Sequence, residues 1–172
     1  MRLFMTIFLI GFVTTTLFAQ DAEKKLKELK IELLKPTPPI GTYVKAVRVG
    51  NLIFLSGHGP TKADGTFMTG KVGKDANLEQ GFIAARQTAI SILSTLKAEI
   101  GDLNKVKRIV KVLGMVNCTE DFTDQPKVMN GFSDLMVSIF GQKGLHARSS
   151  VGVNALPANM MIEVEMIVEV SE

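Results

Sequence analysis

The chain has 172 residues, 46% of them hydrophobic and 22% charged, which is the composition of a globular protein with one domain of ordinary size. Its formal net charge of +3 at pH 7 is too small to hold the phosphate backbone of a nucleic acid. The local excess of lysine lies between Lys24 and Lys30, where charged and apolar residues are spaced as in a helix with one solvated face. Composition therefore argues against a nucleic-acid-binding protein.

Residue types that bind metal ions are scarce. Cys118 is the only cysteine, and His58 and His146 are the only histidines. None of them forms a cluster with carboxylates at metal-ligand spacing, and one cysteine cannot form an intramolecular disulfide. We therefore expect no metal and no cofactor, and we expect Cys118 to be a packed, inert thiol.

The first nineteen residues resemble a secretory signal peptide. Arg2 precedes an apolar core from Phe4 to Val13 that is too short to span a bilayer comfortably, and Ala19 is the best candidate for the cleavage site. Cleavage there would remove one positive charge, leave a net charge of +2, and leave no membrane span. We expect an exported protein, periplasmic or secreted. A buried N-terminal helix is the alternative.

The next segment, residues 20–38, is expected to form an N-terminal helix and a proline arm. Lys and Glu alternate with Leu and Ile at helical spacing from Asp21 to Leu34, and the prolines at positions 36, 38 and 39 then exclude a helix. One domain over residues 39–172 follows.

Apolar periodicity predicts the elements of this domain. Alternating or β-branched runs predict strands, and apolar residues at steps of three and four predict helices. The predicted elements, in chain order, are strands at 43–49 and 52–57 around a Gly50-Asn51 turn, a helix at 78–100, a strand at 106–116, a helix at 126–140, and two closing strands around 148–154 and 162–168 joined by a turn at 156–159. The order β-β-α-β-α-β-β predicts an α+β fold, with the helices on one face of a mixed sheet.

The two closing strands carry polar residues at alternate positions. If they form a hairpin, Arg148, Ser150, Gly152 and Asn154 lie on the same side as Glu163 and Glu165, and this side carries no helices. The pattern is typical of a solvated sheet face or of a site for a charged small molecule. Gly152 in mid-strand suggests that another group approaches closely there.

The expected hairpin would hold Arg148 and Glu163 apart. Glu163 would pair near Gly152, which places it roughly 15 Å from Arg148 at about 3.3 Å per residue. Either the two are unrelated, or the sheet curls strongly, or another subunit completes a shared site.

Several motifs resemble those of the RidA/YjgF family of reactive-intermediate deaminases, also called endoribonuclease L-PSP-like proteins. They are Pro39-Ile40-Gly41-Thr42-Tyr43, Gly50-Asn51 with Ser56-Gly57, Ala147-Arg148-Ser149, and Leu156-Pro157 with Ile162-Glu163-Val164-Glu165. The resemblance runs from about Pro39 to Val170 in family order. It implies a chorismate-mutase-like fold, assembled as a homotrimer whose sheets form an inner barrel and whose ligand sites lie between subunits.

The resemblance also implies roles for individual residues. Arg148 matches the arginine that holds a substrate carboxylate, which a guanidinium can grip with two parallel hydrogen bonds. Glu163 matches the glutamate that activates water, and both are candidate catalytic residues. The other expected substrate-binding residues are Tyr43, Ser56, Gly57, Asn130 and Ser150, the last at a position often occupied by cysteine. His58 replaces a usual glutamine, either as a group at the pocket rim that titrates near neutral pH or as a hydrogen-bonded structural histidine.

The function expected from the resemblance is hydrolytic deamination of reactive 2-imino or enamine acids to 2-keto acids and ammonia. The partner would be a small imino or keto acid that bears a carboxylate. The alternative is a trimer that binds small carboxylates without turning them over. Ribonuclease activity is a third possibility, which the near-neutral charge disfavours.

Overall fold

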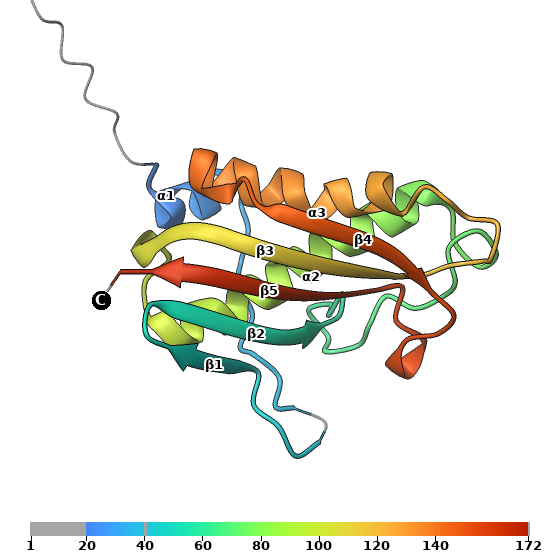
Figure 1. Ribbon diagram of the computed structural model, residues 1–172, viewed down its shortest axis with the longest axis horizontal. Coiled ribbons are helices and arrows are strands. Elements are labelled where there is room, and N and C mark those ends of the chain that lie inside the picture. The colour runs from blue at the N-terminus through green and yellow to red at the C-terminus, as the bar shows by residue number, and fades with distance from the viewer. Residues whose placement is uncertain (1–19, 40, 172) are drawn as a thin grey trace, which may run out of the picture.

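The computed structural model describes residues 20–39 and 41–171, and the expected signal peptide lies outside them. The predicted order of strands and helices is confirmed, with a short helix in front and short 3₁₀ turns between (Figure 1). The elements are α1 (Ala22–Glu28), β1 (Ala46–Val49), β2 (Leu52–His58), α2 (Leu78–Ile100), η1 (Leu103–Lys105), β3 (Val106–Asn117), α3 (Gln125–Phe140), η2 (Gly141–Gly144), β4 (Ala147–Val153), η3 (Pro157–Asn159) and β5 (Ile162–Val170).

The five strands form one mixed sheet in the order β1-β2-β5-β3-β4. β3 and β4 are parallel, and the other neighbours are antiparallel. The expected hairpin of β1 and β2 is present, with Gly50 at φ 57° in its turn. The prediction that the last two strands form a hairpin is wrong, because β3 lies between β4 and β5 and pairs with both. The connection 154–161 therefore crosses the end of β3 instead of forming a tight turn.

The helices α2 and α3 cover one face of the sheet, here called the helix face, and in the described part of the chain no helix covers the other, the open face (Figure 1). The predicted apolar positions of β5 lie on the helix face, where Ile162 and Val164 are fully buried. The prediction that the polar side chains of β4 lie on the face without helices is wrong. Arg148 pairs with the fully buried Val112 and so lies on the helix face, not the open face. β4 is an edge strand, and its helix-face side chains reach the solvated margin of α3, so polarity there does not mark the open face.

Local sequence signals fix both long helices. A reciprocal capping box between Asn77 and Gln80 starts α2, and Gly101, at φ 78°, ends it. Pro126 stands in the first turn of α3, where its missing N–H group costs nothing. The methionines of α3, Met129 and Met136, are fully buried as core residues.

The N-terminal segment is less helical than the sequence predicts. Only α1 is helical, and Lys30, at φ 53°, turns the chain out of the helix before the extended arm that ends at the prolines. Ala22 and Leu26 are buried in the core, and Glu23 bonds to Lys97 of α2 and to the backbone of Leu103. These contacts attach α1 to the domain. No helix in the described residues has both the length and the apolar character needed to cross a bilayer.

Candidate functional site

A cavity of about 550 Å³ opens between the N-terminal arm, the end of β2, the middle of α2 and the start of β5. We call it the arm cavity, since residues 34–38 form one of its walls. Three of the predicted site residues line it: Tyr43, Gly57 and Glu163. The fold thus brings Tyr43 and Glu163, which are 120 positions apart in the sequence, to the same cavity.

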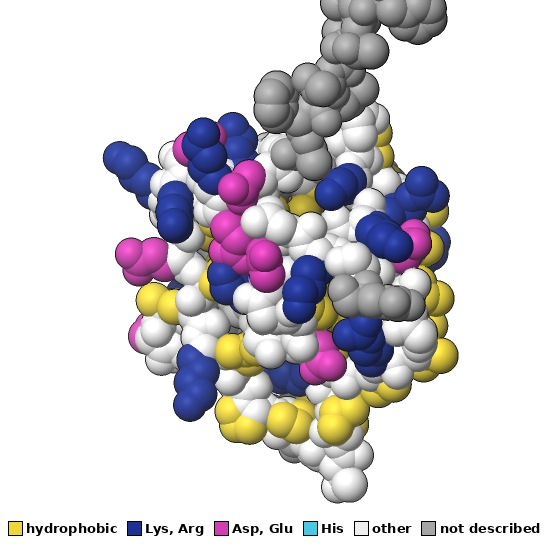
Figure 2. Space-filling view, turned by 90° about the vertical axis from the view of Figure 1, so that its left-hand side faces the viewer, with side chains coloured by type: hydrophobic (Ala, Val, Ile, Leu, Met, Phe, Trp, Pro, Cys, Tyr) yellow, Lys and Arg dark blue, Asp and Glu magenta, His cyan; other side chains and the backbone are white. Residues whose placement is uncertain are grey.

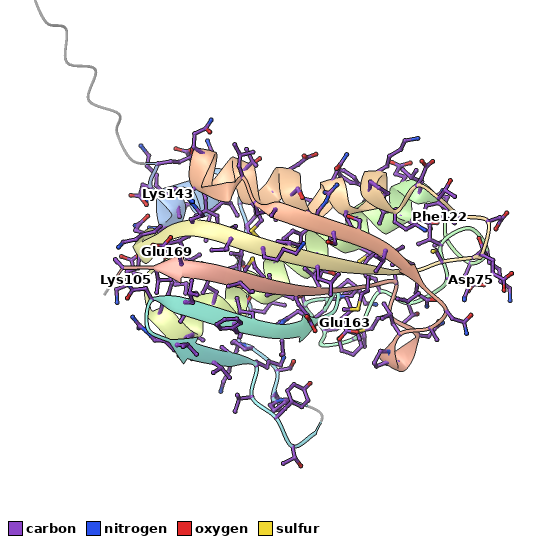
Figure 3. All side chains as sticks on the ribbon, viewed as in Figure 1. Asp75, Lys105, Phe122, Lys143, Glu163 and Glu169 are labelled. Carbon is purple, nitrogen blue, oxygen red and sulfur yellow. The ribbon has the colours of Figure 1, made fainter. Side chains whose placement is uncertain are left out.

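Glu163 lies near the start of β5, beside the end of β2 (Figure 3). Its carboxylate packs directly against Gly57: a Cβ added to that glycine would overlap Oε1 of Glu163 and stand 2.8 Å from its Cδ. A side chain at position 57 would therefore displace the carboxylate from this position. Burial, and then the negative charge of Glu165, raise the pKa of Glu163. A carboxylate that is partly desolvated in this way is a stronger base than one in open water.

His58 is a structural histidine, the second of the two interpretations that its sequence allows. It is only 4% exposed; its Nδ1 donates to the carbonyl of Ser56 at 2.7 Å, and its Nε2 accepts from the hydroxyl of Thr95 at 2.8 Å. Burial lowers the pKa of His58 to about 4, so the ring is neutral at pH 7. It ties the end of β2 to α2 and carries no charge into the cavity.

Ser56 lies beside a second hollow, of about 320 Å³, on the open face. Phe54, Lys111 and Glu165 line this hollow with it. The hydroxyl of Ser56 is buried and has no hydrogen-bond partner in the described residues. The open face is therefore partly apolar and hollowed, which is typical of a surface that another chain covers.

Arg148, at the other edge of the sheet, is held by α3. Its Nη1 donates to the hydroxyl of Ser133 at 2.8 Å, and its Nη2 donates to the carbonyl of Pro126 and to Oδ1 of Asn130, both at 3.1 Å. Asn130, one of the expected substrate-binding residues, thus lies next to Arg148. Among the described residues, these bonds occupy three of the five N–H groups of the guanidinium. The Nε–H and one Nη1–H remain free to bind a ligand.

A relay of hydrogen bonds orients this arginine. Nδ1 of His146 donates to the carbonyl of Gly144 at 2.7 Å, so Nε2 accepts from the hydroxyl of Ser133, 3.0 Å away. That leaves a lone pair of Ser133 for Arg148. Burial first, and the charge of Arg148 in a smaller part, lower the pKa of His146, which keeps the ring neutral.

Ser133 and His146 were not expected in the site. The spacing of Ser133, one helical turn beyond Asn130, was a usable signal, because it places both on one face of α3. Ser150, which was expected, lies two residues after Arg148 on the same side of β4. Its hydroxyl is buried without a partner in the part of the chain described.

Arg148 and Glu163 do not meet within one protomer. Met115 pairs with Glu163 on one side and with Val151 on the other, so two inter-strand spacings, about 10 Å, separate the strands of the two residues. Arg148 is a further three residues along β4 and faces the opposite side of the sheet. Six of the predicted residues therefore form two groups: Tyr43, Gly57 and Glu163 in the arm cavity, and Arg148, Asn130 and Ser150 beside α3. The seventh, Ser56, lies beside the hollow on the open face.

Cys118 is buried, as expected, and touches the side chain of Gln125. A Cβ on Gly152 would stand 2.8 Å from its Sγ and 2.7 Å from Nε2 of Gln125, so the close approach expected at this glycine comes from the protein itself. In the described residues, no group of His, Cys, Asp and Glu could hold a metal ion.

The sequence profile of the endoribonuclease L-PSP family matches residues 34–170. The chain belongs to this family. RidA/YjgF is another name for the L-PSP family. The resemblance found in the sequence is therefore confirmed over nearly all of the described residues.

The chain is similar in sequence to two curated proteins and in structure to a solved protein. Protein TCP17 of Trypanosoma cruzi is 40% identical over 147 residues, which is 85% of this chain and 92% of the relative. A 2-iminobutanoate/2-iminopropanoate deaminase of Dermatophagoides farinae is 32% identical over 131 residues, 76% of this chain and 87% of the relative. The crystal structure of a putative endoribonuclease from Shewanella oneidensis superposes with a TM-score of 0.84 at 28% identity, covering 87% of this chain and 99% of that one.

Proposed function

We propose that the protein hydrolyses 2-imino acids, and the enamines that tautomerise to them, to 2-oxo acids and ammonia. The observation that carries this proposal is the partly buried carboxylate of Glu163, which lies in the arm cavity against Gly57 with a raised pKa. A relative that carries the name of an imine deaminase supports it.

Glu163 would act as a general base and then as a general acid. Its carboxylate takes a proton from water while the water oxygen bonds to the imine carbon and the C=N electron pair moves to nitrogen. The proton then passes to the nitrogen, which gives a carbinolamine with an NH2 group. The carboxylate next takes the hydroxyl proton and passes it to the nitrogen, the C–N bond breaks, and ammonia leaves as the C–O bond becomes a carbonyl. A raised pKa suits both steps, because it brings the carboxyl group nearer to the working pH.

Arg148 would hold the substrate carboxylate. Its guanidinium is fixed by Ser133, Pro126 and Asn130, and its Nε–H and one Nη1–H remain to donate to a carboxylate; a two-pronged grip would need Nη2 to release Pro126 or Asn130. Since Arg148 and Glu163 lie far apart in one protomer, we propose that the site forms where copies of the chain meet, in a homotrimer. The partly apolar open face of the sheet supports such an assembly, because Phe54 and Val47 are 40% and 49% exposed there.

The other two functions receive less support. Over the described residues at the end of the molecule that carries α1, acidic and basic side chains are interspersed and form no continuous basic surface for RNA (Figure 2). Binding of small carboxylates without turnover would need Arg148 but would not need a base at position 163. The test below therefore separates catalysis from binding.

The deciding experiment compares Glu163→Gln with Glu165→Gln. Both changes replace a carboxylate by a nearly isosteric amide on the open face of β5, but Glu165 lies outside the arm cavity. With imines generated in situ by an amino-acid oxidase, Glu163→Gln should lower kcat by about 10²–10⁴-fold, while Glu165→Gln should retain most of the activity. Equal activity of both variants would exclude Glu163 as the base. A wild-type protein that binds 2-ketobutyrate but does not exceed the spontaneous rate would be a binding protein.

We also propose that residues 1–19 direct export and are then removed, since their pattern is that of a signal peptide. The mass of the N-terminal peptide from the native host would test this, because an intact Met1 would contradict it.

A further inference from the structure

The arm cavity is larger than a short imino acid requires. Its volume of about 550 Å³ lies in the range of pockets that bury much larger ligands, whereas 2-iminobutanoate has only an ethyl side chain. The cavity continues from Glu163 past His58 to Ser91 of α2 and to the arm at Pro36. Space beyond the reacting atoms is therefore available for a substrate side chain.

The charges around this space are unbalanced. Three lysines, Lys35, Lys45 and Lys62, line the cavity, and Glu163 is the only carboxylate of the described residues that does so. Lys35 and Lys62 are exposed at its rim, whereas Lys45 is partly buried. An anionic group is the ligand that this arrangement favours, because it would restore electrostatic balance where water is partly excluded.

Lys45 is held in a fixed place. Its Nζ donates to the hydroxyl of Thr37 in the arm at 2.9 Å, and its backbone carbonyl accepts from the N–H group of Ser56 at 3.0 Å. Its charge reaches into the cavity, since it contributes to the lowered pKa of His58. Burial in turn lowers the pKa of Lys45 itself.

The ammonium group of Lys45 has donors to spare. It forms no ion pair with any described residue, and the bond to Thr37 uses one of its three N–H groups. A carboxylate that entered the cavity could accept the other two. This would also offset the cost of having removed the ammonium group from water.

We propose that the arm cavity selects 2-imino acids with a second carboxylate at the end of the side chain, and that Lys45 binds this carboxylate. The inference rests on the proposed function. Arg148 holds the carboxylate next to the imine, Glu163 handles the proton, and Lys45 determines which side chain is accepted. The protein would then act on imines of dicarboxylic amino acids in preference to imines with neutral side chains of similar length.

The first test uses two imines generated in situ, 2-iminoglutarate from glutamate and the imine of methionine, which has a neutral unbranched side chain of similar length. Wild-type kcat/KM should favour 2-iminoglutarate by roughly ten- to a hundred-fold, the effect of a hydrogen bond between charged groups. Lys45→Gln keeps a donor for Thr37 but not the charge, so it should lower kcat/KM for 2-iminoglutarate and abolish the preference. Lys74→Gln, an exposed lysine outside the cavity, should leave the preference unchanged.

The second test is independent of turnover. Calorimetry should show that the wild-type protein binds 2-oxoglutarate more tightly than 2-oxopentanoate and that Lys45→Gln removes this difference. If imines are hydrolysed but neither the wild-type rates nor the affinities favour the dicarboxylate, the inference is wrong and the proposed function stands. If no imine is hydrolysed while Lys45→Gln still removes a preference for 2-oxoglutarate, the proposed function is wrong and the assignment of Lys45 as a carboxylate-binding residue stands.

Discussion

At the scale of single residues, Arg148 is held by α3 and is the residue that we propose binds the substrate carboxylate. Arg148→Lys keeps the charge but not the planar group that reaches Ser133, Pro126 and Asn130 together. We expect the affinity for 2-ketobutyrate to fall by roughly ten- to a hundred-fold, the effect of losing one charge-assisted hydrogen bond. Calorimetry would measure this.

A matched variant is Arg86→Lys, which changes an arginine of α2 that is in neither group of candidate site residues. It should bind 2-ketobutyrate as the wild type does. Unchanged affinity in Arg148→Lys would show that the guanidinium does not hold the ligand.

His58 should make stability depend on pH. In the unfolded chain it takes up a proton as the pH falls through its ordinary pKa of 6.5, whereas in the folded protein it stays neutral down to its lowered pKa of about 4. The free energy of unfolding should therefore be fully retained above pH 6.5 and decrease as the pH falls toward 4. At pH 4.5 the linkage amounts to about 2–3 kcal/mol.

Urea unfolding of the wild type and of His58→Gln at pH 7.5 and 4.5 would measure this effect. The amide does not titrate, so the variant should lose about 2–3 kcal/mol less than the wild type on acidification. The raised pKa of Glu163 acts in the opposite sense in both proteins and cancels in the comparison. Parallel losses in the two proteins would show that His58 is charged in the folded state.

At the scale of elements, α3 packs closely against the backbone of α2 at Gly131. A Cβ there would overlap the backbone carbonyl oxygen of Phe82 and stand 3.0 Å from its carbon, and backbone cannot turn aside. Gly131→Ala should therefore destabilise the protein by about 1–3 kcal/mol, measured by urea unfolding, despite the better helix propensity of alanine.

Gly81→Ala is the matched change on the other helix. A Cβ there would meet only side-chain methyl groups of Val128 and Val72 at 3.2–3.3 Å, which can shift by a few tenths of an ångström. This variant should be markedly more stable than Gly131→Ala. If the two variants unfold alike, the helices are not held apart by the backbone contact.

The elements themselves could be predicted from the sequence because their signals are local. The apolar stripe of α2, its cap at Asn77 and the glycine turn of β1 and β2 each lie within a few residues. The partners of β4 could not be predicted in this way. Its pairing with β3 joins segments more than thirty residues apart, for example Val112 with Arg148, and nothing local distinguishes that pairing from a hairpin with β5.

The candidate site was predictable to the same degree. Residue types and family motifs identified Arg148 and Glu163, and their separation within one chain was also anticipated. The separation does not come from a hairpin of β4 and β5, because β3 lies between these two strands. Ser133, His146 and Lys45 were missed because their roles come from contacts between α3 and β4 or between the arm and β2, which only the fold creates.

At the scale of the whole molecule, the open face should be the contact surface of a trimer. Light scattering at micromolar concentration should give about three times the protomer mass. Phe54→Asp places a charge on this face and should shift the protein toward monomer and lower its activity, because the two groups of site residues would separate.

Ile83→Asp is the comparison for this change, since Ile83 is similarly exposed, at 48%, but lies on α2. It should remain trimeric and active. A wild-type protein that is monomeric at this concentration and still hydrolyses imines would show that one protomer contains the whole site.

The position of β5 has a consequence for how the protein is made. Of the described strands, β5 is the last to leave the ribosome, yet it lies in the interior of the sheet, between β2 and β3, and those two strands do not pair with each other. Until residues 162–170 emerge, the earlier strands form two separate ribbons with unpaired edges, which are surfaces prone to aggregation. A chain that stops before residue 162 would therefore have neither a continuous sheet nor Glu163, so every chain with an intact sheet also carries the candidate catalytic carboxylate.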